Sequence, residues 1–141
     1  MREFLQKVNK TLAWHARRLQ RGIRSVRWAL APRPADRPVI VVGCSRAGTT
    51  LVYKTLSESR ELGSLQRETH DYWTTLHPLA DKHWNTHALG VEDASAADRD
   101  AVSRYFHAWT GHHRWVDKNN QNGLAVPYLH ALFPDAVFVF V

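Results

Sequence analysis

VIVVGCSRAGTTLVYKTL, at residues 39–56, sets the topology that we expect for the rest of the chain. Its apolar beginning predicts a buried strand over 39–43, and its second half predicts a helix over about 48–59 whose inner face consists of Leu51, Val52, Thr55 and Leu56. Gly43 and Gly48 bound the turn between them. A strand, a glycine-bounded turn and a helix N-terminus direct several backbone N–H groups and a partial positive charge at one point. We therefore expect this turn to bind an oxyanion.

The turn differs from an ATP-binding loop in one important position. Such a loop has lysine where this chain has Thr49, followed by Ser or Thr, here Thr50. The lysine helps to neutralise a triphosphate, and the hydroxyl holds Mg²⁺. Arg46 instead offers a planar guanidinium that suits phosphate or sulfate oxygens. A ligand of lower charge density, such as a phosphosulfate, needs neither the lysine nor a metal.

Charge is unevenly distributed along the 141 residues, a length that suits one domain. Residues 1–30 carry eight Lys or Arg and one acidic residue, whereas residues 31–141 carry eleven Lys or Arg and twelve acidic residues. The globular part therefore lacks a basic footprint, and we expect no nucleic-acid partner. The single cysteine, Cys44, excludes an internal disulfide and fits a reducing compartment, so a cytoplasmic location is expected.

The N-terminal arm, residues 1–30, is predicted to form a basic amphipathic helix. Its apolar stripe recurs at spacings of three and four and consists of Phe4, Val8, Leu12, His15, Leu19, Ile23, Val26 and Leu30. Such a helix could lie on an anionic membrane surface, or it could pack on the domain or on a partner. No run of about 18 apolar residues exists, so no helix is expected to span a membrane. A stiff linker with three prolines follows at residues 31–38.

Strand and helix patterns alternate through residues 39–141. Beyond the first strand and helix, the expected elements are a short strand at 62–65, a helix capped by Asp93 or Ser95 that runs to about 110, a strand at 115–117, a helix at 123–133 and a buried strand at 136–141. The alternation indicates an α/β fold with a parallel sheet and flanking helices, of the P-loop NTPase-like type. The chain stops inside an apolar run at Val141, where a ligand-binding turn is expected. We therefore expect residues 39–141 to be the N-terminal part of a truncated domain.

Two segments together resemble one enzyme family. PVIVVGCSRAGTTLVYKTLSES, residues 38–59, resembles the 5′-phosphosulfate loop of sulfotransferases that use 3′-phosphoadenosine 5′-phosphosulfate (PAPS). WVDKNNQNGLAVPYLHALFPDAVFVFV, residues 115–141, is similar to the family segment in which a strand and a lysine lead to a helix, "LFPDA" and a further strand. The resemblance implies transfer of a sulfonate group from PAPS to a hydroxyl of a carbohydrate, lipid or small-molecule acceptor, with no metal. The family turn that helps to bind the 3′-phosphate would start beyond Val141.

The resemblance also assigns roles to individual residues. The donor-binding residues that it implies are Ser45, Arg46, Ala47, Gly48, Thr49 and Thr50. Lys118 matches a lysine that stabilises charge on the bridging oxygen, although Asn119 and Asn120 replace the usual Thr-Pro after it. Attack on sulfur also requires a base. Glu68 stands where several family members carry a catalytic glutamate, and His70 is the second candidate. The alternatives are that Lys118 is a surface lysine and that Glu68 pairs with Arg67 or Lys82.

Two other functions remain open from the sequence. A degenerate P-loop nucleotide kinase or NTPase needs a Mg²⁺-binding aspartate at the end of a later strand, and Asp117 could supply it. A non-catalytic, membrane-associated remnant would act mainly through residues 1–30. His83 and His87 have the spacing of helical metal ligands, but no Cys, Asp or Glu pattern completes a zinc site, and we expect no metal. The tryptophans are expected in the core or in an acceptor pocket, and those considered are Trp73, Trp84, Trp109 and Trp115.

Overall fold

The structure is a computed structural model, and it describes residues 2–83 and 85–141. Side chains within the first helix are described from Leu12 onward. The side chains of Phe4 and Val8, which belong to the expected apolar stripe, and the whole of Trp84 lie outside this description.

A three-stranded parallel sheet forms the centre of the molecule, with strand order β2-β1-β3. The central strand β1 (Val39–Val42) pairs with β2 (Val116–Lys118) on one side and with β3 (Val137–Phe140) on the other. Val41 lies opposite Lys118 in the register, and Val42 lies opposite Phe140. The predicted α/β class with a parallel sheet is therefore confirmed, and the carboxyl ends of all three strands meet at one edge.

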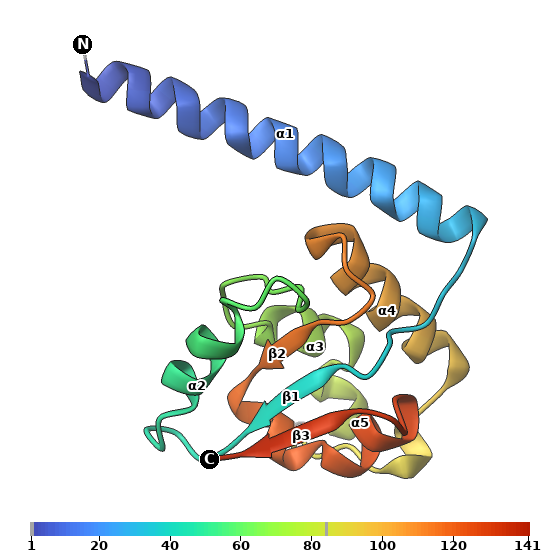
Figure 1. Cartoon of the computed structure of the whole chain (residues 1–141). Helices are drawn as coiled ribbons and strands as arrows, with labels where there is room; N and C mark the ends of the chain where they lie inside the picture. Colours follow the sequence, from blue (N-terminus) through green and yellow to red (C-terminus); the bar gives the residue numbers. More distant parts are fainter. Residues whose placement is uncertain (1, 84) are drawn as a thin grey trace.

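Helices cover both faces of the sheet because successive side chains of β1 point to opposite sides. Val39 and Val41 pack with Tyr53 of α2 (Thr49–Leu56) on one face. Ile40 and Val42 pack in the larger cluster on the other face, which includes residues of α3 (His70–Leu76), α4 (Ala96–Thr110) and α5 (Val126–Leu132). Figure 1 shows this layered arrangement, with α2 and the group of α3, α4 and α5 on opposite sides.

Three short 3₁₀ segments complete the chain, namely η1 (Leu79–Lys82), η2 (Val91–Asp93) and η3 (Asn120–Leu124). The cap of α4 is Ser95, whose hydroxyl accepts from the Asp98 amide at 3.0 Å, as one of the two sequence alternatives predicted. The expected strand at 62–65 is wrong, because that segment makes only an isolated bridge between Gly63 and Trp115. The helix expected at 123–133 begins only at Val126, after η3.

Two predicted burial patterns are also corrected. The expected inner face of α2 is right for Val52 and Leu56, which pack in the cluster with Val39 and Val41, but Tyr53 is the buried apolar residue and Leu51 is 71% exposed. The strand at 136–141 was expected to be buried, yet β3 is half-buried and Phe140 is 70% exposed. β3 is only half-buried because it lies at the edge of the sheet, and Tyr53 is the buried residue of α2 because it packs on Val39 and Val41.

The first helix, α1 (Arg2–Leu30), is a long rod outside the layered domain (Figure 1). It packs on α4 through one side, where Trp28 is buried, Arg104 donates to the Ser25 hydroxyl at 2.8 Å and Arg21 lies over the ring of Trp109. The apolar stripe lies on another side and is exposed from Leu12 to Leu30. Among the described residues, no helix combines the length and the apolar character needed to cross a bilayer.

Candidate active site

The loop between β1 and α2 is tightly constrained. A Cβ atom on Gly43 would lie 2.7 Å from Cγ2 of Thr49 and 2.8 Å from the carbonyl oxygen of Val141, so only glycine fits there. Gly48 has φ +95°, which favours glycine, and Arg46 has φ 69°. The glycines noted in the sequence therefore allow the chain to turn directly from the strand into the helix.

The backbone of this loop presents unused hydrogen-bond donors. The Ala47 amide donates to the Cys44 carbonyl at 3.2 Å and closes the turn, so it is already occupied. Within the described part of the chain, five other loop amides donate no hydrogen bond, namely those of Ser45, Arg46, Gly48, Thr49 and Thr50. These N–H groups precede or begin α2, where the helix dipole adds partial positive charge. The arrangement suits a bound anion.

A cavity of about 640 Å³, here called the loop cavity, opens at the carboxyl edge of the sheet. It is lined by Ser45, Arg46, Gly48, Thr49, Thr50, Leu51, Glu68, Lys118 and Asn120. Seven of these nine residues were predicted as site residues from the sequence, and they come from three separate segments of the chain. Ala47 and His70, which were also predicted, are not among the lining residues.

Lys118 and Glu68 form an ion pair at the wall of this cavity. Lys118 ends β2, its side chain is only 5% exposed, and its Nζ lies 2.5 Å from Oε1 of Glu68. Glu68 remains 38% exposed, while Nδ1 of His70 lies 3.8 Å from Oε2 of Glu68. Lys118 is therefore not a surface lysine. His70 lies next to the Glu68 carboxylate, and 62% of its side chain is exposed.

The alternative partners considered for Glu68 are engaged elsewhere. Arg67 pairs with Asp71 at 3.1 Å, and Lys82 pairs with Asp93 at 2.6 Å. Glu68 is thus held by a lysine that is 50 residues further along the chain. The parallel pairing of β1 with β2 brings that lysine to the carboxyl edge of the sheet.

Asp117 stabilises the same region from the core side. Its carboxylate accepts hydrogen bonds from Thr69 Oγ1 at 2.5 Å, Trp73 Nε1 at 3.1 Å and Asn122 Nδ2 at 3.3 Å. Burial raises the pKa of Asp117, although these donors act in the opposite direction. Because Asp117 is 1% exposed and does not line the loop cavity, it is not placed to hold Mg²⁺ there, contrary to the requirement of the NTPase alternative.

The cavity therefore combines backbone amides at the start of a helix, an arginine, a nearly buried lysine and a partly exposed carboxylate. This set can hold a phosphate-linked anion, stabilise a leaving oxygen and accept a proton. Sequence reasoning did not identify Asn120 or the Asp117 network, because both depend on contacts made after folding. Within residues 2–83 and 85–141, no three His, Cys, Asp or Glu side chains form a group that could hold a metal.

Comparison with known proteins identifies the class of this site. A family model described as "Sulfotransferase family" matches residues 38–141, which contain the whole sheet and every residue that lines the loop cavity. The same comparisons give no match among curated proteins or solved structures.

Proposed function

The chain belongs to the sulfotransferase family, and we propose that its loop cavity binds the phosphosulfate group of PAPS and directs the sulfonate to an acceptor hydroxyl. This proposal rests on one observation. A single cavity is bordered by Arg46, Lys118, Glu68 and five loop amides that have no hydrogen-bond partner among the described residues. Members of this family generally use PAPS, which supports the choice of donor.

Each of these residues has a separate role in the proposed reaction. The loop amides and Arg46 hold the phosphosulfate oxygens, which need no lysine within the loop because two adjacent single charges are less demanding than a triphosphate. Lys118 directs its ammonium at the bridging oxygen, where negative charge develops as the S–O bond breaks. Glu68 accepts the proton of the attacking hydroxyl as the new O–S bond forms. Adenosine 3′,5′-bisphosphate then leaves with the bridging oxygen.

The Lys118–Glu68 ion pair fits this sequence of events. At the cavity wall, Oε1 of Glu68 accepts from Lys118, whereas Oε2 of Glu68 lies nearer to His70. A donor oxygen that attracts Lys118 weakens its bond to Glu68, and the carboxylate becomes a better proton acceptor. His70 lies close enough to Glu68 to hydrogen-bond with it after a small movement, which makes His70 the second candidate for the base.

A matched pair of arginine variants tests the proposal. Arg46→Asn removes the guanidinium of the loop cavity, and Arg37→Asn makes the same change at another exposed position with positive φ, 44°. Asparagine tolerates this backbone region, so neither change strains the chain. Release of adenosine 3′,5′-bisphosphate from PAPS should fall at least about tenfold for Arg46→Asn alone, since charge-assisted contacts are the strong ones. Equal rates for both variants would contradict the proposal.

We also propose that α1 contacts an anionic membrane surface. Its side that includes Trp28 packs on the domain, while Leu19, Ile23 and Val26 form an apolar groove on another side, flanked by Arg18 and Arg27. An apolar strip between arginines matches the boundary between acyl chains and anionic headgroups. The proposal therefore commits to a lipid surface as the occupant of this groove.

Vesicle sedimentation tests this membrane proposal. Leu19→Gln combined with Ile23→Gln should abolish sedimentation with phosphatidylserine-containing vesicles, whereas Ala13→Gln combined with Ala29→Gln, at exposed positions outside the groove, should not. Vesicles of phosphatidylcholine alone should bind less in every case, because the arginines then lack anionic partners. Sedimentation that is unchanged in the first double variant, or equally reduced in both double variants, would overturn the proposal.

A further inference from the structure

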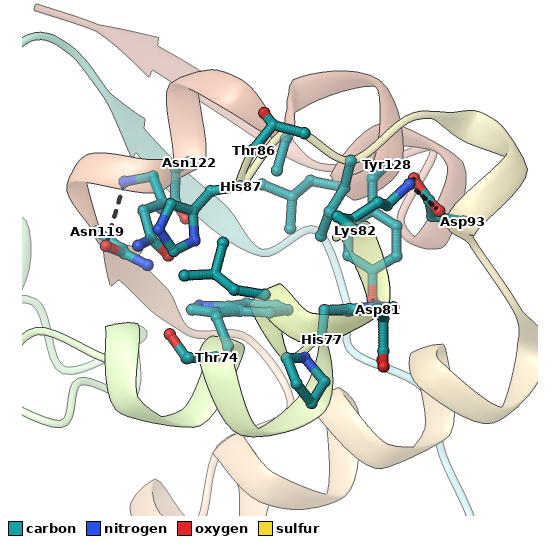
Figure 2. A pocket seen from close by; sticks show the side chains of 17 residues that line it. Thr74, His77, Asp81, Lys82, Thr86, His87, Asp93, Asn119, Asn122 and Tyr128 are labelled. Atoms are coloured by element: carbon teal, nitrogen blue, oxygen red, sulfur yellow. Dashed lines mark hydrogen bonds and ion pairs between the residues drawn. The ribbon is translucent and has the colours of Figure 1, made fainter. Parts of the chain in front are cut away.

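A second pocket, here called the side pocket, lies on the other side of the segment that follows β2. It has a volume of about 320 Å³ and is bordered by α3, η1, η3 and α5. Figure 2 shows Asn119 at one end of the side pocket, with Tyr128 and the Lys82–Asp93 pair at the other. Pockets for small molecules range from about 300 to 1,000 Å³, so this one suits a ligand of one or two rings.

Asn119 leaves one donor unused in this pocket. The residue is 3% exposed, and its Oδ1 accepts from the Gln121 amide at 3.2 Å, which fixes the orientation of the side chain. Its Nδ2 is buried and has no hydrogen-bond partner among the described residues. Buried polar groups are almost always paired in folded proteins. The amide nitrogen of Asn119 is therefore a donor for an oxygen of a bound ligand.

The charges around the side pocket favour a neutral ligand. Nζ of Lys82 donates to both carboxylate oxygens of Asp93, at 2.6 and 2.8 Å, so this lysine is already neutralised. Among the described lining residues there is no other lysine and no arginine, while Asp81 adds a negative charge. A sulfated or carboxylated acceptor would meet that negative charge without a free cation to compensate.

The other lining groups match a molecule with many hydroxyls. The imidazole of His87 and the hydroxyl of Thr74 offer polar contacts, while Trp73 and Leu89 offer apolar surface. Nε2 of His77 is already engaged with Asp98 and Tyr128. Carbohydrates present both hydroxyls and C–H faces, and aromatic rings with nearby polar groups recognise them. A long-chain alcohol would leave the polar groups of this pocket unpaired.

The side pocket adjoins the loop cavity through the residues after β2. Lys118 and Asn120 line the loop cavity, and Asn119 and Gln121, which alternate with them in the chain, line the side pocket. We propose that the side pocket is the acceptor subsite and that it holds a neutral carbohydrate, whose oxygen accepts from Asn119 while one hydroxyl extends to Glu68. This inference rests on the proposed sulfonate transfer.

Two variants of neighbouring residues on α3 test the acceptor subsite. Thr74 lines the side pocket, whereas Thr75 faces away from it and donates to the Asp71 carbonyl. Thr74→Trp should weaken the binding of lactose, measured by saturation-transfer NMR, at least about tenfold, and Thr75→Trp should leave it unchanged. Dodecanol and a uronic-acid disaccharide, as apolar and anionic probes, should bind the unaltered protein more weakly than lactose. Equal effects of the two variants, or preference for either other probe, would overturn the inference.

A second variant removes the unused donor without adding charge. Asn119→Ser is neutral and keeps a side-chain oxygen that can accept from the Gln121 amide, but it lacks Nδ2. Lactose binding should fall, while binding of adenosine 3′,5′-bisphosphate, measured by calorimetry, should stay within about twofold of the original. Loss of lactose binding with intact nucleotide binding supports the subsite. If the nucleotide binds normally and lactose binding is unaffected, the subsite alone fails; if the unaltered protein binds no nucleotide, the proposed function fails first.

Discussion

Two hydrogen-bonded contacts join β2 to the segment at residues 68–69, and they differ in their access to solvent. The core-side contact links Asp117 to Thr69, both about 1% exposed, and the cavity-side contact links Lys118 to Glu68, whose carboxylate is 38% exposed. Successive residues of a strand point to opposite faces. The adjacent residues Asp117 and Lys118 therefore make different contacts, one in the core and one at the cavity.

The two contacts are neighbours, but we expect the core-side contact to contribute to stability and the cavity-side contact to contribute to the reaction. The core-side contact is surrounded by Trp73 and Asn122, which donate to the same carboxylate, and it has no route to a ligand in the loop cavity. The cavity-side contact borders that cavity and can exchange partners with a bound anion. We infer that the buried contact fixes the position of Glu68, while the exposed contact takes part in the reaction.

The largest effect is expected from breaking the core-side contact. Asp117→Ala leaves the donors of Thr69 and Asn122 without their acceptor in the core, while Nε1 of Trp73 keeps only the Thr69 hydroxyl. Each unpaired buried donor is costly, so the free energy of unfolding should fall by about 3–5 kcal/mol. Urea denaturation followed by tryptophan fluorescence measures it. A loss below about 1 kcal/mol would show that this contact does not hold the fold.

Changes at the cavity-side contact should affect the reaction more than the fold. Glu68→Gln keeps the shape of the side chain but removes the base, so the rate of sulfonate transfer should fall by about 10²–10⁴-fold. The free energy of unfolding should fall by about 1–2 kcal/mol, less than for Asp117→Ala, because the nearly buried Lys118 loses a charged partner but can still donate to the glutamine oxygen. His70→Gln is the matched comparison, and its rate should change much less. If His70→Gln has the larger effect, His70 is the base instead.

Thr69→Val tests the core-side contact separately, because it alters that contact and changes none of the residues that line the loop cavity. The variant removes the hydroxyl that donates to Asp117 and accepts from Trp73 while preserving volume. Loss of one hydrogen bond to a charged group should reduce the free energy of unfolding by about 2 kcal/mol. If Thr69 positions its neighbour Glu68, kcat should fall while the affinity for the nucleotide remains. A fall in affinity with unchanged kcat would contradict that positioning role.

The smallest expected effect is a dependence of stability on pH. Burial raises the pKa of Asp117 above its ordinary value of 3.8, so the folded chain holds this proton more tightly than the unfolded chain. The stabilisation is complete below the unfolded pKa and is lost as pH rises through the folded pKa, by at most about 1.4 kcal/mol per pH unit. The unaltered protein should therefore lose stability relative to Asp117→Asn as the pH rises above the ordinary value of 3.8. Denaturation curves for both chains at a series of pH values above 3.8 would show a constant difference if the prediction is wrong.

Local patterns in the sequence predicted the sheet, the turn between β1 and α2 and the long helices, because strand and helix periods and the two loop glycines are visible without tertiary contacts. They did not predict that Tyr53 of α2 is buried and Leu51 exposed, since eight residues fit more than one face and the contact of Tyr53 with Val39 and Val41 forms only on folding. They also misplaced β3 in the interior, because its composition does not show that it pairs with only one neighbour.

The site was predictable residue by residue only through the family resemblance. That resemblance named Lys118 and Glu68 separately, but their ion pair joins positions 50 residues apart and follows from the parallel pairing of β1 with β2. Asp117 was interpreted as a possible metal ligand, whereas its surroundings are three donors and no solvent. The unused amide of Asn119 depends on the packing of α3, η3 and α5, which no local pattern encodes.

The most direct test of the central claim is calorimetry with two nucleotides. A cradle of loop amides with Arg46 and two threonine hydroxyls should bind adenosine 3′,5′-bisphosphate in the presence of EDTA, because neither a lysine at position 49 nor Mg²⁺ is required. ATP with Mg²⁺ should bind at least about tenfold more weakly, a difference of about 1.4 kcal/mol. Tighter binding of ATP with Mg²⁺, lost when EDTA is added, would contradict the account.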